Sequence, residues 1–585
     1  MQSWVADWER SPRLPHYTRA NAGETLPEPA SPLGWTLAYV HVLRAWRQGF
    51  IDIGVYREDE LSIDRPEIAG LFGSYFYLNL SHMRLFSLRL GMPVEQTDLA
   101  FVGQRPDIPA YVFHPDHVDA ERSAAAGASV QRLLAVTEFT DAVADRERVR
   151  AMRRDRPDLT ALSDAELVAR VRALLDESEK SIFYRHLVST LPASFGPGIL
   201  GPLCESVGRG GDLLDLISGI GDIDSASPAV GLWNLSRIVV GSGELAALFD
   251  KGSATVAAAL DTDATGDVGA FRDAFAAFLG DYGDRGPNEW DIHSLPWEVD
   301  LTAALTLVDR LRNSPESHSP AVRHEALAAR RTQTAAEIRT VLADNAQALA
   351  TFDVGMQAVD VWMPARERTK ANCVAALHEI RMTIRELGRR GVVAGRFGRP
   401  EDVMMLLADE LDAYLADPAR FTEVIAQRLV EYGELAELEP PFFVAQDPDI
   451  ERWPRRDRER PEPAIVGDVF TGVGGSHGTY TGRVRVVTDL AECDALEPGE
   501  VLVSPITDAA WTPLFLVAGA AVVDVGGLNS HAVVVCRELG IPCVISVGDG
   551  TSRLRDGVEV TVDGNAGTVT VLSAAPLAAA GTTGV

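Results

Sequence analysis

Val525-Gly-Gly-Leu-Asn-Ser-His531-Ala-Val-Val-Val-Cys-Arg-Glu-Leu-Gly540 is the stretch that most constrains the fold of this chain. It predicts a strand that ends in two glycines, followed by a short helix. Ser530 takes the N-cap position of that helix, His531 is its first residue and Gly540 is its C-terminal cap. The positive end of the helix dipole disfavours an imidazolium at His531 and favours a neutral, nucleophilic ring.

The same helix start suits a covalently attached anion. Free backbone amides there would stabilise a phosphoryl group on His531, and Gly526 and Gly527 allow a ligand to approach the backbone closely. The geometry therefore suits phosphoryl carriage on His531. The local pattern fits about equally well a histidine that only caps a helix in an ordinary α/β domain.

Short β-branched segments surround this stretch and are bounded by Gly, Pro or Asp. They predict strands at 482–487, 500–506, 521–526, 543–547 and 558–562. Two helix starts lie between them, at Thr512-Pro513 and at Ser530-His531. We expect a small α/β domain over residues 467–573, followed by a flexible tail over 574–585.

From about residue 30 to 440 the dominant period of the sequence is helical. Ser163-Asp-Ala-Glu166 is a capping box that opens an amphipathic stretch. Similar stretches lie near 35–48, 80–90, 128–152, 243–260, 268–281, 301–312, 320–350, 364–390 and 401–416. We expect one large, mainly helical domain over 1–438. Residues 439–466, rich in Pro and charge, predict a stiff, solvated linker that lets the α/β domain move.

Composition narrows the classes of partner. The chain has 54 Lys plus Arg and 84 Asp plus Glu, a net charge of −30, which disfavours nucleic acid or an anionic membrane surface. Its five cysteines have no CxxC spacing, as expected of reduced thiols in the cytoplasm. No apolar signal segment opens the chain, and no HExxH pattern or close His/carboxylate cluster predicts a metal site.

Gly526-Gly527-x-x-Ser530-His531, the following Arg-Glu-Leu-Gly-Ile-Pro, and the closing Asp556-Gly…Asp563-Gly hairpin resemble the phosphohistidine swivelling domain. That domain occurs in phosphoenolpyruvate synthase, pyruvate phosphate dikinase and rifampin phosphotransferase. By this resemblance, His531 is the histidine that accepts phosphate.

The helical region resembles the substrate-binding domain of the rifampin enzyme. The resemblance rests on 18–33, 76–80, 282–291 and 400–411. Members of this family have an ATP-grasp domain or a barrel that binds phosphoenolpyruvate, whereas this sequence begins almost directly with the substrate-domain pattern. The resemblance therefore implies that a separate ATP-grasp subunit supplies the phosphoryl group from ATP and Mg²⁺, and that this chain binds no cofactor itself.

A predicted helix over 363–391 carries a second group of candidates. Its apolar stripe continues toward the N-terminus onto Lys370 and Arg366, where the helix dipole disfavours cations. A phosphoryl group in transfer would resolve that conflict, although both side chains could instead extend into water. The Arg366-Glu367-x-x-Lys370 pattern also resembles the rifampin enzyme's catalytic cluster, which makes Glu367 a possible base for a substrate hydroxyl.

A polar turn between helices, Tyr282-Gly-Asp-Arg285-Gly-Pro-Asn-Glu289-Trp-Asp291, is a further candidate. Arg285, Glu289 and Asp291 could line a substrate pocket. A network of arginine and carboxylates that holds the loop is at least as good an interpretation.

Together these patterns predict a phosphotransferase subunit that carries a phosphoryl group on His531 to a hydroxyl of a small organic molecule. One alternative is a dehydratase or condensing enzyme with a transient phosphorylated intermediate. Another is a non-catalytic binding protein that has lost its donor domain.

Overall fold

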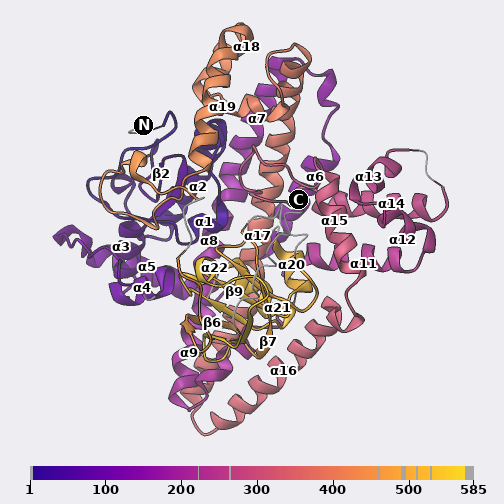
Figure 1. Ribbon diagram of the computed structural model, residues 1–585. Coiled ribbons are helices and arrows are strands. Elements are labelled where there is room, and N and C mark those ends of the chain that lie inside the picture. Colours follow the sequence, from indigo (N-terminus) through magenta and orange to yellow (C-terminus); the bar gives the residue numbers. More distant parts are fainter. Residues whose placement is uncertain are drawn as a thin grey trace.

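The structure, a computed structural model, describes residues 4–103, 105–221, 223–262, 265–456, 461–488, 496–508, 511–527 and 530–573. A large helical block is followed by a small α/β domain (Figure 1). The predicted fold class, mainly helical and then α/β, is confirmed. The predicted tail over 574–585 lies outside the described residues.

The helices of the block are mostly short. They are α1 (Ala22–Thr25), α2 (Val40–Asp52), α3 (Leu80–Arg89), α4 (Val94–Val102), α5 (Ala120–Leu134), α6 (Thr140–Arg154), α7 (Asp164–Ser178), α8 (Tyr184–Thr190), α9 (Phe195–Ser206), α10 (Leu213–Leu216), α11 (Ser227–Val240), α12 (Gly243–Phe249), α13 (Ser253–Leu260), α14 (Gly266–Tyr282), α15 (Leu301–Arg312), α16 (Pro320–Val341), α17 (Ala346–Val393), α18 (Leu411–Ala416) and α19 (Thr422–Ala436). Helix α7 begins with the predicted capping box, in which Ser163 and Glu166 cap each other's backbone amides.

Helix α17 is the long central helix of the block, at 48 residues. It packs against α6, α7, α8, α9 and the 3₁₀ turn η9 (Pro400–Met405), and it runs behind the α/β domain in Figure 1. The predicted start near Met363 is wrong, because Asn345 caps the helix and Pro364 lies inside it. Proline at 364 removes one backbone hydrogen bond, but packing on both sides of that turn keeps the helix continuous.

Glycine at 388 lets α17 approach η9. A Cβ at this position would overlap the carbonyl oxygen of Pro400, a backbone atom that no side-chain rotation can move. We expect Gly388→Ala to lower the free energy of unfolding by about 1–3 kcal/mol, the usual cost of overpacking. Gly433→Ala in α19 is the matched control, because nothing lies within 4 Å of its Cβ position, and it should stabilise by about 0.5–1 kcal/mol. Equal denaturant midpoints for the two variants would contradict this prediction.

A small antiparallel sheet at one side of the block joins distant segments. Its strand order is β2 (Ala69–Phe72), β3 (Tyr75–Asn79), β1 (Tyr17–Thr18) and β4 (Phe443–Val444). Strand β4 comes from the segment predicted to be a solvated linker, and it pairs with β1.

The prediction of an unpacked linker is wrong for residues 439–456. Ile450 and Trp453 are buried, the Trp453 ring lies against Gly73, and Arg456 donates to Glu28 at 3.0 Å. The few apolar residues in this stretch follow no period, so the pattern hid their packing. Of the remaining predicted linker, residues 457–460 lie outside the described residues, and Ala464 is buried and donates its backbone amide to the Arg553 carbonyl oxygen at 3.0 Å.

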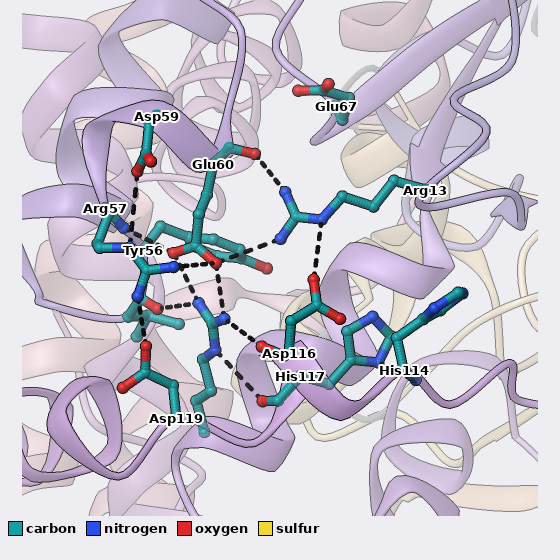
Figure 2. A network of polar contacts seen from close by, with 12 residues as sticks. Arg13, Tyr56, Arg57, Asp59, Glu60, Glu67, His114, Asp116, His117 and Asp119 are labelled. Carbon is teal, nitrogen blue, oxygen red and sulfur yellow. Dashed lines mark hydrogen bonds and ion pairs between the residues drawn. The ribbon is translucent and has the colours of Figure 1, made fainter.

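A buried polar network links Arg13 of the N-terminal segment to Glu60 and Arg89 of the helical block (Figure 2). Glu60 accepts hydrogen bonds from Arg89 at 2.7 and 3.0 Å and from Arg13 at 3.3 Å. Carboxylate and guanidinium groups are buried here at low cost only because each is paired. We therefore interpret this network as structural.

One continuous helical run, Asp164–Ser206, is long and apolar enough to cross a membrane by length and composition, and 39% of its most apolar window is buried. It includes α7, α8 and α9, all of which pack against α17.

The α/β domain is built on one mixed sheet. Its strand order is β5 (Val469–Thr471), β12 (Thr568–Val571), β11 (Glu559–Asp563), β7 (Thr479–Val486), β8 (Val501–Ser504), β9 (Ala520–Val523), β10 (Cys543–Ile545) and β6 (Val473–Ser476). The strands from β7 to β10 are parallel. Helix α20 (Thr512–Val517) connects β8 to β9, and α21 (His531–Leu539) connects β9 to β10; α22 (Gly550–Arg553) follows β10.

The α/β domain is docked on the helical block. Helices α20 and α21 pack against α11, α15 and α16, and a single apolar cluster includes Trp297 and Leu305 of the block together with Leu514 and Phe515 of α20. Docking buries the start of α21, where His531 is 5% exposed. This orientation places the predicted carrier histidine inside the molecule.

Candidate active site

His531 lies where the sequence predicts it. It is the first residue of α21, Ser530 is the N-cap, and Gly540 closes the helix in the left-handed conformation at φ 62°. The Ser530 hydroxyl makes no capping hydrogen bond in the structure, so the backbone amides at this helix end are not capped by that side chain.

Two threonine hydroxyls bracket the imidazole ring. Thr507 Oγ1 lies 3.1 Å from Nδ1, and Thr512 Oγ1 lies 3.0 Å from Nε2. Thr507 follows β8 and His531 follows β9, so the carboxyl ends of neighbouring parallel strands bring them together. The sequence analysis gave neither threonine a role in the site, although the strand end before Thr507 and the helix start at Thr512 could have indicated them.

The electrostatic environment keeps His531 neutral. Burial lowers its pKa well below the ordinary value, and the charges of Lys370, Arg285 and Arg366 lower it further. A neutral imidazole has the free electron pair that a nucleophile needs. The helical block thus supplies cations to a histidine that belongs to the α/β domain.

Arg366, Glu367 and Lys370 lie in the middle of α17, so the argument from the helix dipole is wrong for them. Their inward direction agrees with the prediction, since Glu367 is 4% exposed and both cations act on His531. Glu367 contacts Arg366 and accepts a hydrogen bond from Ser225. Burial raises its pKa, but Arg366, Lys370 and that hydrogen bond outweigh burial and lower it overall. A base with a lowered pKa is poorly suited to take a proton from a hydroxyl.

The polar turn at 282–291 divides into two parts. Arg285 and Glu289 form a buried ion pair, with Arg285 Nε 3.1 Å from Glu289 Oε2. The charge of Arg285 also lowers the pKa of His531. Asp291 instead accepts from the backbone and hydroxyl of Ser31, both at 2.7 Å. The structure therefore brings Arg285 and Glu289 toward the site, whereas Asp291 holds the start of the chain in place.

The two glycines before α21 lie on the docked face. A Cβ on Gly527 would come within 3.2 Å of the Ala100 carbonyl oxygen of α4, and one on Gly526 within 3.1 Å of Ser530 Oγ. Nearby, Asp508 accepts from the Asn288 backbone at 2.9 Å. Gly527 therefore permits close contact between the domains, and Gly526 permits close packing on Ser530 within the α/β domain. A phosphate-binding role for both glycines stays a prediction.

Glu24 is a further residue that the sequence analysis missed. It lies in α1, within the opening pattern of the block, and its Oε2 accepts a hydrogen bond from the His531 backbone amide at 3.2 Å. Its other oxygen, Oε1, is buried and has no hydrogen-bond partner among the described residues. Burial raises the pKa of Glu24 to about 7, against the lowering effects of the His531 amide, Lys370 and Arg366.

Family models match both domains. Residues 496–567 match the PEP-utilising enzyme mobile domain, and residues 185–367 match the rifampicin phosphotransferase fourth domain. The first match contains His531, and the second contains Arg285, Glu289 and Arg366. These two segments of the chain are similar to domains of the phosphoenolpyruvate-utilising family, which includes rifampicin phosphotransferase.

Curated relatives agree with this family. Rifampicin phosphotransferase of Streptomyces sviceus is 30% identical over 305 residues, covering 52% of this chain and 34% of the relative. An uncharacterized protein of Mycobacterium tuberculosis is 38% identical over 215 residues, covering 36% and 23%. The prodigiosin synthesizing transferase PigC of Serratia marcescens is 25% identical over 603 residues, covering 96% and 64%. The chain thus spans only about a quarter to a third of the first two relatives.

Proposed function

We propose that this protein is a cytoplasmic phosphotransferase of the phosphoenolpyruvate-utilising type, in which His531 carries a phosphoryl group to a hydroxyl of a small organic molecule. The observation that carries the proposal is the neutral, buried His531 at the start of α21, facing cations of another domain. A non-catalytic binding protein has no need of a nucleophile in this position.

In the transfer step, the acceptor oxygen attacks phosphorus and the bond between phosphorus and the His531 ring nitrogen breaks. The ring nitrogen regains its electron pair, and the hydroxyl proton passes to a base. Arg366 and Lys370 would stabilise the phosphoryl oxygens in the transition state. Arg285, paired with Glu289, would add positive charge at the same place.

The donor in this proposal is an ATP-grasp subunit that binds ATP and Mg²⁺. His531 is buried against the block when docked, so the α/β domain must leave this position to be phosphorylated. Residues 439–456 are packed on the block, so they would stay with it when the α/β domain moves.

A second candidate function is synthetic chemistry, in which the phosphorylated hydroxyl is lost during dehydration or condensation. The relative that aligns with 96% of this chain is named a prodigiosin synthesizing transferase, which favours this candidate. Both candidates need the same transfer from His531.

The proposal is tested with the protein, a candidate ATP-grasp subunit and γ-labelled ATP. We expect an acid-labile, base-stable label that maps to the peptide containing His531. The mass of a small-molecule product then separates the candidates, since a gain of phosphate supports simple transfer and a loss of water supports synthesis. A label of acid-stable type, or one on another peptide, would contradict phosphohistidine carriage.

A further inference from the structure

The transfer step needs a group that takes the proton of the acceptor hydroxyl. Such a base must lie beside the phosphorylated ring when the carrier is docked, and it must not already be held by cations. Glu367 fails the second condition, because it contacts Arg366 and accepts from Ser225. Glu289 is ion-paired with Arg285 at 3.1 Å.

Glu24 meets both conditions. Its hydrogen bond to the His531 amide fixes the carboxyl group at the first residue of α21, the same residue that would carry the phosphoryl group. Lys370 and Arg366 lower the pKa of the Glu24 carboxyl and that of the His531 ring alike, so the same two cations of α17 act on both groups. The buried oxygen Oε1 has no partner within the described part of the chain and can accept a proton.

We propose that Glu24 is the general base of the transfer step. This inference rests on the proposed function. The acceptor hydroxyl gives its proton to Glu24 as its oxygen bonds to phosphorus. The phosphorus–nitrogen bond breaks, and His531, protonated on its other ring nitrogen, leaves as a neutral imidazole.

The charge state of Glu24 agrees with this role. Burial raises its pKa to about 7, close to the value at which a base is both deprotonated and strong at neutral pH. The charged and titratable groups that act on it are Lys370, Arg366 and Glu367 on α17, and its hydrogen-bond partner is the backbone of His531 on α21. The rate of transfer should therefore rise with pH through about 7 and then level off.

The experiment separates phosphorylation from transfer. The protein is labelled on His531 by the donor subunit and ATP, and both are then removed. Glycerol is added as a hydroxyl probe, and the rate at which the label leaves His531 is measured across a pH series. Glu24→Gln should take up the label as the wild type does, because Glu24 lies on the block and the carrier is charged away from it. Its chase should be about 10²–10⁴-fold slower and should lose the inflection near pH 7.

Glu28→Gln is the matched control, since Glu28 follows in the same segment but pairs with Arg456 at the surface; it should chase as the wild type does. Glu24→Asp should recover part of the rate, because it keeps a carboxylate. Normal labelling of Glu24→Gln with a wild-type chase would overturn the inference alone, as would an inflection that disappears in Glu289→Gln instead. Absence of label on wild-type His531 would overturn the proposed function and, with it, this inference.

Discussion

His531→Ala is expected to abolish labelling of the protein by the donor subunit and ATP. Alanine has no nucleophilic nitrogen, and the substitution removes the ring that contacts Thr507 and Thr512. The loss should be complete, because covalent carriage has no slower route around the missing atom. Label retained after gel filtration, measured at acid and alkaline pH, is the readout.

His477→Ala is the control for this variant. His477 also lies in the α/β domain, but its Nδ1 is 2.7 Å from Asn565 Oδ1, and it does not begin a helix. It should label normally. Alanine is a good helix former, and it would occupy the first position of α21, whose C-terminal cap at Gly540 is well formed. The domain of the His531→Ala protein should therefore stay folded. Wild-type labelling of the His531→Ala protein would exclude the carrier role.

Arg366→Ala and Lys370→Ala are expected to slow transfer while leaving phosphorylation of His531 largely intact. Both residues lie on α17, whereas in the proposed cycle His531 is phosphorylated after the α/β domain has left the block. Each variant should lower the rate of label transfer to glycerol by about 10²–10³-fold, the usual effect of removing one preorganised charge-stabilising group. The cations matter most in the transition state, where charge on the phosphoryl oxygens is redistributed.

Arg389→Ala tests whether any lost cation on α17 has this effect. Arg389 lies on the same helix but pairs with Glu386 at the surface, and its side chain is 50% exposed. We expect its chase rate to match the wild type, and similar melting temperatures for all three variants, since alanine is a good helix former. Wild-type chase rates in Arg366→Ala and Lys370→Ala would mean that these cations pack at the interface between the domains and do not stabilise the transition state of transfer.

Elements with local signals could be predicted from the sequence. The start of α21 at His531, its cap at Gly540 and the start of α20 at Thr512 all appear where the sequence analysis expects them. Each depends on a few neighbouring residues: an N-cap, a proline in the first turn, or a glycine able to adopt a positive φ. The parallel strands are equally local, because β8 and β9 are buried on both faces and read as continuous apolar runs.

Elements whose limits depend on packing could not be predicted. Helix α17 continues through Pro364 because neighbouring helices surround it, and β4 forms in a charged, proline-rich stretch because β1 offers it a partner. Propensity is a weak guide where tertiary contacts outweigh it.

The candidate site shows the same division. The sequence by itself determined a nucleophilic histidine at a helix start and an Arg366-Glu367-x-x-Lys370 pattern on another helix. Only the tertiary structure decided that the two face each other, that Asp291 holds Ser31, and that Glu24 meets the His531 amide from 507 residues away. Local patterns encode which helix begins where, but a contact between distant residues depends on how the whole chain packs, and burial at that contact sets the charge state of Glu24.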